Sequence, residues 1–192
     1  MLVDLNECAF LTRILPVTKI EEEAMKFTTG DAIVHPIRGA GIVERIVERT
    51  WHGNAELYYR IRLLGQSGTM LMIPTSVAEK LGMRCAISRS DMRHLWCILL
   101  AAPGNLPDEH RELQQFLQDK LGTGDIFQVA EAVRDMAWRQ WKTHLSATAK
   151  QLYEEGIRLL VGEIAATQGI EFVDAETQVR ARLREHLSQS PA

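Results

Sequence analysis

The spacing of apolar residues changes near residue 88, and this change limits the folds that the chain can adopt. Before it, short runs rich in Val, Ile and Tyr alternate apolar with polar side chains, as in "YRIRL" at 59–63. That period is typical of half-buried strands. After it, apolar residues recur every three or four positions, the period of an amphipathic helix. The sequence therefore predicts an α+β protein of two domains, with strands first and helices second.

The first domain is predicted to span residues 26–86. Gly-containing stretches, "WHGNA" and "GQSG", separate its apolar runs and are typical of hairpin turns. Four or five short antiparallel strands would form a small β-barrel, which closes its own edges. A short helix is expected over 74–82, ended by Gly82. The expected strands lie within the runs at 32–36, 39–51, 56–64 and 69–74.

The second domain is predicted to span residues 87–192 as a compact all-α domain of about five helices. Ser88 or Ser90 could cap the first helix, Asp125 the third and Ser146 the fourth, because their side chains accept hydrogen bonds from free backbone N–H groups. Asp174 is expected to start the last helix, which would end near 188. The other helices are expected near 90–101, 108–121, 126–143 and 146–167.

Residues 1–25 fit neither pattern. They include the acidic run "EEE" at 21–23, and we expect a helical fragment or a disordered arm there.

Composition excludes several classes of protein. No apolar run approaches the length of a membrane span, the longest being "LWCILLAA" at 95–102. The N-terminus is a poor secretion signal. The three cysteines are scattered, without a CxxC pair, which favours a reducing cytoplasm over disulfides or zinc. We therefore expect a cytoplasmic protein without membrane contact, metal or cofactor.

Net charge makes broad nucleic-acid binding unexpected. The chain carries 22 cations and 25 anions, for a net charge of −3. Residues 1–26 carry 3 cations and 5 anions, residues 27–83 carry 6 cations and 5 anions, and residues 84–192 carry 13 cations and 15 anions. DNA-binding domains are often strongly basic. Any contact with nucleic acid must therefore be local.

Catalysis has little support. The six histidines are dispersed and form no HExxH pair. Ser146 and Lys150 are one residue too far apart for an S-x-x-K motif. The glycines of "RGAG" at 38–41 precede a strand rather than a helix, so we interpret them as a turn or bulge rather than a phosphate loop. We expect no catalytic residues.

The helix expected at 126–143 carries two apolar arcs. Its core stripe is predicted to hold Ile126, Val129, Ala130, Val133, Met136 and Ala137. A second arc lies roughly 90° away on an ideal helix and holds Phe127, Arg134, Trp138 and Trp141, with Lys142 at its border and Arg139 further round. Two tryptophans off the main stripe either pack against neighbouring helices or face a partner.

Several motifs together resemble the CarD/CdnL family of bacterial transcription regulators. They are "GDAIVHPIRGAG" at 30–41, "TMLMIP" at 69–74, "LGTGDIFQVAEAVRDM" at 121–136 and "EEGIRLLVGEIA" at 154–165, and the likeness covers about residues 26–168. The resemblance implies a Tudor-like barrel that binds the RNA polymerase β subunit. It also implies a helical domain that contacts promoter DNA, weakly and largely independently of sequence, at the upstream edge of the melted bubble.

The resemblance also implies site residues. Arg49 and Met72 occupy positions associated with polymerase contact; the alternatives are a solvated arginine and a core methionine. The family's DNA-wedging tryptophan follows V-R-D-[hydrophobic], and here that position is Ala137. Trp138 or Trp141 could replace it, with phosphate contacts from nearby cations. The helix before it keeps only Arg111 and Lys120 where relatives have clustered cations, which predicts weaker DNA binding. The predicted DNA-binding residues are Arg134, Trp138, Arg139, Trp141 and Lys142.

The sequence therefore predicts a monomeric transcription regulator that binds polymerase and stabilises the open promoter complex. The alternative is a polymerase-binding adaptor whose helical domain binds another protein, and a small enzyme is a third, unsupported class. Relatives usually begin just before the G-D motif, so translation could start at Met25 instead of Met1.

Overall fold

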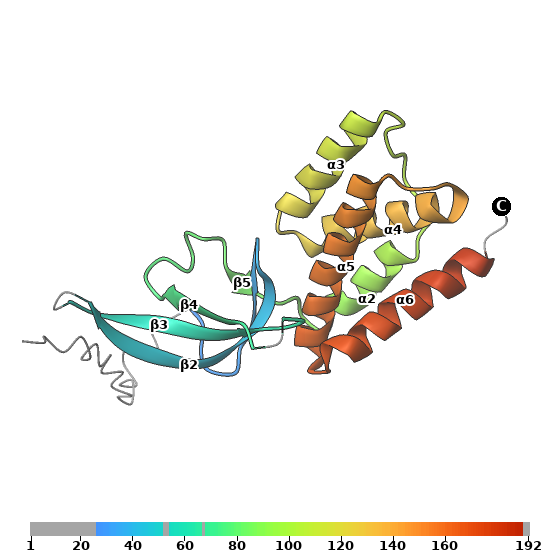
Figure 1. Ribbon diagram of the computed structural model, residues 1–192. Helices are drawn as coiled ribbons and strands as arrows, with labels where there is room; N and C mark the ends of the chain where they lie inside the picture. Colours follow the sequence, from blue (N-terminus) through green and yellow to red (C-terminus); the bar gives the residue numbers. More distant parts are fainter. Residues whose placement is uncertain (1–25, 52–53, 67, 190–192) are drawn as a thin grey trace, which may run out of the picture.

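The computed structural model describes residues 26–51, 54–66 and 68–189; the arm predicted at 1–25 lies outside them. Within these ranges five strands precede five helices, which confirms the predicted α+β order. Figure 1 shows the sheet on one side of the molecule and the helices on the other. No helix in the described ranges is both long and apolar enough to cross a membrane. The strands are β1 (Ala32–His35), β2 (Gly39–Trp51), β3 (Asn54–Leu63), β4 (Met70–Pro74) and β5 (Arg84–Cys85).

The five strands form one antiparallel sheet in the order β4-β3-β2-β1-β5. A register shift between Val43 and Arg45 marks a bulge in β2, which increases local twist. The sheet packs a small core against one face, where the rings of Phe27 and Tyr59 meet edge to face with centroids 5.6 Å apart. Ala78 and Met83, from the segment that joins the two edge strands, complete this core.

The short helix predicted at 74–82 is wrong: this segment is a series of turns. Its backbone N–H groups donate over unequal spans, from Gly82 to Glu79, from Leu81 to Val77 and from Met83 to Ala78. A helix needs a repeated four-residue span. Here the chain must instead place Ala78 and Met83 into the core of the sheet, so packing overrides helical propensity.

The helices are α2 (Asp91–Leu99), α3 (His110–Gly122), α4 (Ile126–Lys142), α5 (Ala147–Gln168) and α6 (Phe172–Gln189). Asp125 and Ser146 cap α4 and α5 as predicted, since their side chains accept the N–H groups of Phe127 and Ala149. Ser88, not Ser90, accepts the N–H of Asp91 at the start of α2.

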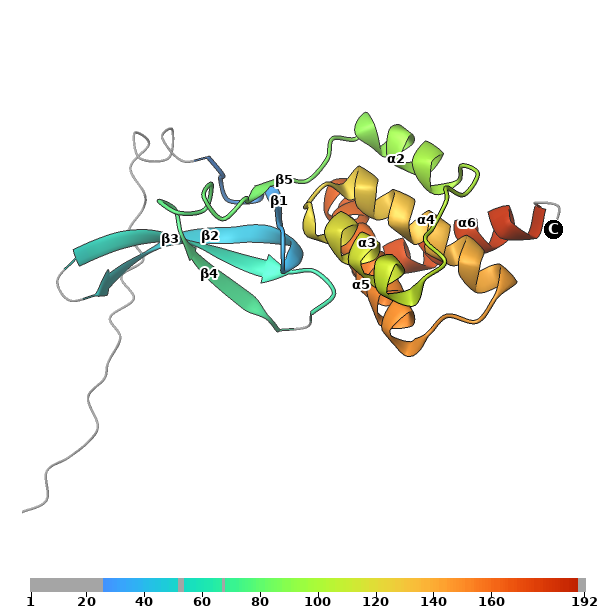
Figure 2. The same cartoon turned by 90° about the horizontal axis from the view of Figure 1, so that it is seen from above.

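The start of α6 and the buried face of α4 can also be compared with the sequence-based predictions. α6 begins two residues before the predicted Asp174. The core stripe predicted on α4 is buried throughout, and α4 contacts every other helix (Figure 2).

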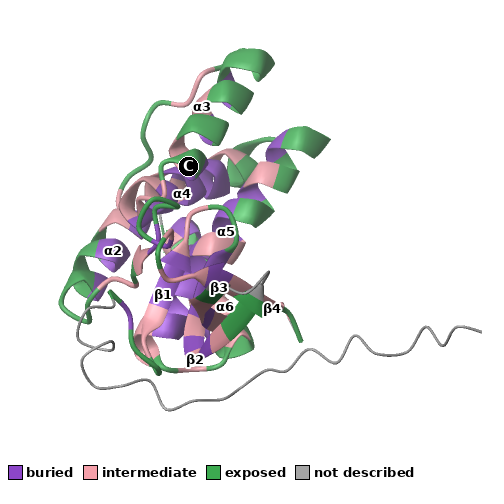
Figure 3. Ribbon diagram, turned by 90° about the vertical axis from the view of Figure 1, so that its left-hand side faces the viewer, coloured by how far each residue is buried: buried purple, intermediate pink, exposed green. Residues whose placement is uncertain are grey.

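The two domains meet where α5 crosses β1 and β2. Buried residues lie along α5 and on the neighbouring strands (Figure 3). Ala166 packs with Val34 and Ala40 in a small cluster. At Gly65, whose φ is +73°, an added Cβ would lie 2.5 Å from the ring of Phe172 on α6. The sheet and the helices therefore pack directly against each other and are not separated by a flexible linker.

A buried ion pair lies at the centre of this junction. Glu163 on α5 is 1% exposed and accepts hydrogen bonds from both terminal nitrogens of Arg84, at 2.6 and 2.9 Å, and from the N–H of Ile87 at 3.0 Å. Arg84 also donates to the carbonyl of Gly124, just before α4. Burial alone would lower the pKa of Arg84, but the hydrogen bond and charge of Glu163 raise it above its ordinary value. Arg84 thus joins the sheet, α5 and the start of α4.

Removing one member of this pair should destabilise the whole chain. Arg84→Met leaves the Glu163 carboxylate buried without its counter-charge, which costs about 3–5 kcal/mol. Arg84→Met/Glu163→Leu should recover much of that loss, because no unpaired charge remains. Urea denaturation measures both, with exposed Arg89→Met as the matched control. Equal stability of Arg84→Met and the control would contradict the role assigned to the pair.

Candidate functional site: an outer sheet face and the far end of α4

The register of the sheet places Arg49 and Met72 on the same face. Arg49 lies opposite Glu56 on β3, and Met72 lies opposite Arg60 on β3. Opposed residues share a face, and so do residues four apart on one strand. Tyr59 and Ile61 point from the other face into the core. The two residues predicted to contact polymerase therefore share the outer face of the sheet, with Arg49 on β2 and Met72 on β4, opposite positions of β3 that are four residues apart.

Arg49 is exposed and has no ion pair within the described residues. Its cross-strand neighbour Glu56 instead accepts hydrogen bonds from the hydroxyls of Tyr58, at 3.1 Å, and Ser76, at 2.8 Å. The hydrogen bond to Glu56 raises the pKa of Tyr58, and the positive charge of Arg49 opposes that shift. The guanidinium of Arg49 is thus near Tyr58 yet unneutralised. Met72 is half-buried on the same face, so this face offers both a charge and an adaptable apolar contact.

The two tryptophans of α4 lie in different environments. Trp138 is 9% exposed, and its ring meets His186 of α6 edge to face with centroids 6.0 Å apart. Trp141 is 57% exposed. Ala137, at the position where the resembled family has tryptophan, is buried. Trp141 lies one turn beyond Ala137, and both line the same groove. Only Trp141 presents a large ring to a partner at this end of α4.

Three of the residues predicted to contact DNA, Trp138, Arg134 and Arg139, have contacts inside the helical domain. Arg134 pairs with buried Asp135, at 2.7 Å, and donates to the carbonyl of Ile98. Arg139 donates to the carbonyl of Pro107 at 2.6 Å. Arg134 thus fastens the last turn of α2 to α4, and Arg139 fastens the α2–α3 connection to α4. Of the five residues predicted to contact DNA, only Trp141 and Lys142 are exposed.

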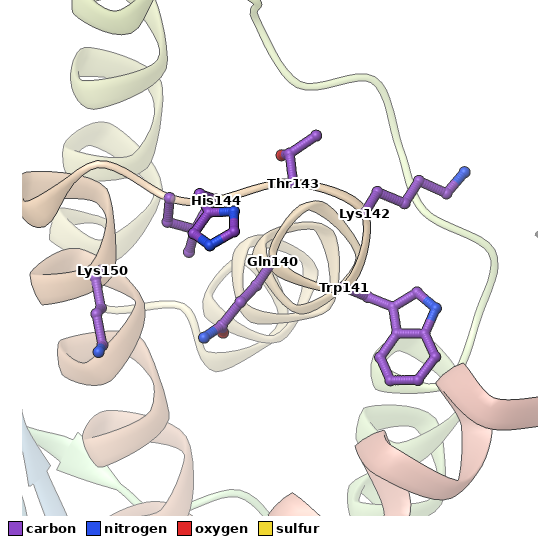
Figure 4. Close-up of a pocket in the computed structure, with 7 residues that line it drawn as sticks. Gln140, Trp141, Lys142, Thr143, His144 and Lys150 are labelled. Carbon is purple, nitrogen blue, oxygen red and sulfur yellow. The ribbon is translucent and has the colours of Figure 1, made fainter.

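Two grooves flank Trp141. One, of about 340 Å³, lies between α4, α5 and α6 and includes Tyr153, Arg180 and Arg184. The other, of about 350 Å³, lies at the α4–α5 connection and includes Lys142, His144 and Lys150. Figure 4 shows the ring of Trp141 and the side chain of His144 on opposite sides of Gln140 at the end of α4. Among the described residues, no group of three or more His, Cys, Asp and Glu side chains could hold a metal.

Sequence reasoning missed the residues that α5 and α6 bring to α4, because they follow it by up to about fifty positions in the chain. It also missed Glu163, although a lone carboxylate within the apolar run "LLVGEIAA" (159–166) was a signal. A buried charge requires a partner of opposite charge or hydrogen-bond donors, so this apolar run indicates that Glu163 is paired. Arg84 carries no such signal, since arginines are common on strands that face solvent.

Replacing each tryptophan by alanine should separate a core role from a surface role. Trp138→Ala should cost about 3–5 kcal/mol of unfolding free energy, as for other buried aromatic residues. Trp141→Ala should change it by less than about 0.5 kcal/mol, as is usual at the surface. Urea denaturation followed by circular dichroism compares the two. A larger loss for Trp141→Ala than for Trp138→Ala would contradict this arrangement.

Comparison with known proteins agrees with this two-part organisation. The family model described as the CarD-like/TRCF RID domain matches residues 27–87. The model described as the CarD C-terminal domain matches residues 98–180. A similar protein from Bacillus subtilis (strain 168), named "Putative transcription factor YdeB", is 30% identical over 144 residues, which cover 75% of this chain and 94% of that protein. The sheet and the helices thus match the two successive halves of one architecture, and the chain belongs to the CarD-like family of transcription factors.

Proposed function

We propose that this protein binds the β subunit of RNA polymerase in the cytoplasm through the outer face of its sheet. From there it stabilises the open promoter complex through the far end of α4. Trp141 carries the proposal: a tryptophan 57% exposed at a helix end, beside the exposed cation Lys142. Large apolar rings that face solvent mark interaction sites. A ring at the edge of a DNA bubble can stack on an exposed base or enter the minor groove.

Tethering reconciles a role at DNA with an acidic domain. Residues 84–192 carry 13 cations and 15 anions, so free binding to DNA should be weak. A sheet already bound to polymerase raises the local concentration of the helical domain at the promoter. The packed junction at Glu163 then fixes where Trp141 lies relative to the polymerase. Weak contact with DNA is sufficient under these conditions.

The polymerase contact is tested by reversing one charge. Arg49→Glu should abolish capture of RNA polymerase by the full-length protein, because an unpaired cation on the binding face becomes an anion beside Glu56. Pull-down with purified polymerase measures this. Arg89→Glu reverses an exposed charge away from the sheet and serves as the control. Capture that survives Arg49→Glu would show that the contact lies elsewhere.

The DNA contact is tested by the lifetime of open complexes formed with purified polymerase. Loss of one base stack is worth about 1–3 kcal/mol, so Trp141→Ala should shorten the lifetime gained from the protein about fivefold or more, with polymerase capture unchanged. Val173→Ala, which truncates another exposed apolar residue, should have no effect. An unchanged lifetime with Trp141→Ala would refute the stacking role.

A second function is favoured by one observation: Trp138, Arg134 and Arg139 all serve the interior of the helical domain. A domain that uses these residues internally could act as an adaptor that binds another protein through Trp141. In that case Trp141→Ala would leave open-complex lifetime unchanged and would weaken binding of the third protein.

A further inference from the structure

A histidine closes the turn between the first two strands. β1 ends at His35 and β2 begins at Gly39, and the register places these two residues opposite each other. The Nδ1 atom of His35 accepts hydrogen bonds from the backbone N–H groups of Ile37, at 3.1 Å, and Arg38, at 3.3 Å. A ring nitrogen accepts a hydrogen bond only when it carries no proton. The turn therefore requires neutral His35 with its proton on Nε2.

The same turn contacts the helical domain. β1 lies at the end of the sheet that faces the helices (Figure 2). A Cβ added at Gly82 would lie 3.1 Å from the ring of Pro36, and one added at Gly124, just before α4, would lie 3.7 Å from it. The carbonyl of Arg38 accepts a hydrogen bond from Arg158 on α5 at 3.4 Å. The turn thus forms a second contact between the sheet and the helices, in addition to the buried ion pair.

The surroundings of His35 favour its neutral form. Burial, followed by the positive charge of Arg38, lowers the pKa of the half-buried His35 ring, and a backbone hydrogen bond opposes this to a smaller extent. Among the described residues, no carboxylate forms an ion pair with His35. The charged groups of the elements packed against the turn are Arg84 of β5, which pairs with Glu163 of α5, Arg158 of α5, Asp125, which caps α4, and, in the segment after β4, Lys80 and Glu79, which pairs with Lys26.

We propose that His35 is a positioning residue, which holds the helical domain against the sheet through this turn and releases the turn when it is protonated. An imidazolium ring carries an N–H group at each nitrogen, so Nδ1 would no longer accept from Ile37 and Arg38. Two backbone donors would then face a third donor, beside the positive charge of Arg38. Because the turn joins the sheet to α4 and α5, its release changes how the helices are oriented on the sheet. The consequence for open complexes rests on the proposed function, since the helices carry Trp141.

The pH dependence of this contribution has a defined sign. The pKa of His35 is lower in the folded chain than its ordinary value, so the unfolded chain binds the proton more readily. The contribution of His35 to stability is therefore complete above the unfolded-state pKa of about 6.5. It is lost as the pH falls below that value.

Two substitutions at His35 separate the acceptor from the titrating charge. His35→Asn keeps an acceptor that does not titrate, because the side-chain oxygen of Asn is attached to Cγ as Nδ1 is, and Asn commonly accepts the backbone N–H two residues ahead. His35→Leu removes the acceptor at every pH. His110→Asn makes the matched change at an exposed histidine that begins α3, and it serves as the control.

Nuclear magnetic resonance of the full-length protein measures the turn and the orientation of the domains. In the wild type, the proton of neutral His35 should lie on Nε2, and the amide signals of Ile37 and Arg38 should shift with the same midpoint as the ring. Residual dipolar couplings report the orientation of the helices relative to the sheet. They should change between about pH 8 and about pH 5 in the wild type and in His110→Asn, and stay constant in His35→Asn. His35→Leu should show the low-pH orientation at both values.

Three results would overturn the inference: a proton on Nδ1 of neutral His35, an orientation that does not change with pH in the wild type, or an equal change in His35→Asn. Urea denaturation gives an independent check, because the wild type should lose stability relative to His35→Asn as the pH falls.

A separate measurement with purified polymerase distinguishes this inference from the function on which its consequence rests. The lifetime of open complexes with the protein, divided by the lifetime without it at the same pH, should fall with pH for the wild type and less for His35→Asn. If the wild type leaves this ratio at one while the orientation responds as expected, His35 stands as the positioning residue and the proposed function fails. If the ratio exceeds one and the orientation does not respond, the proposed function stands and the role of His35 is refuted.

Discussion

The buried carboxylate of Glu163 is the constraint on which the arrangement of this protein depends. A charge that is 1% exposed is tolerated only when it is neutralised and hydrogen-bonded. Arg84, in the edge strand β5, and the N–H of Ile87, in the segment between β5 and α2, provide both. Because Arg84 also binds the carbonyl of Gly124, one side chain fixes the edge strand, the long helix α5 and the start of α4. Separating the domains would leave Glu163 unpaired.

Because of this junction, the two ends of α4 lie in different environments: one is bound to the sheet and the other is exposed to solvent. The carbonyl of Gly124, just before α4, is bound to Arg84 of the sheet, and the last turn of α4 carries Trp141 and Lys142, which are exposed to solvent. The helix has 17 residues, a length of about 25 Å at 1.5 Å per residue. The middle of the helix is buried against the other helices. The function proposed above uses this rigid connection, because a tethered contact gains most when its reach is fixed.

The same helix carries its exposed tryptophan one turn after Ala137, the position where the resembled family has tryptophan. Ala137 is small and buried, and a ring there would meet the core rather than solvent. Trp138 packs beside α6, Arg134 holds the last turn of α2, and Arg139 holds the α2–α3 connection. Trp141, one turn later, is 57% exposed. The function proposed above depends on this exposed ring at the end of α4.

The sequence by itself determined the two-domain α+β order, the strand runs, the core stripe of α4 and the caps at Asp125 and Ser146. These features follow from local rules: alternation for strands, a period of 3.6 for helices and free N–H groups at helix starts. Sequence patterns could not show which tryptophan is exposed, that Arg134 and Arg139 are used internally, or that Arg84 neutralises Glu163. Those outcomes depend on contacts between residues far apart in the chain. Trp138, for example, packs against His186 of α6, which follows it by almost fifty positions. Only the tertiary structure settles them, because exposure and ion pairing are properties of packed surfaces and not of a single helix.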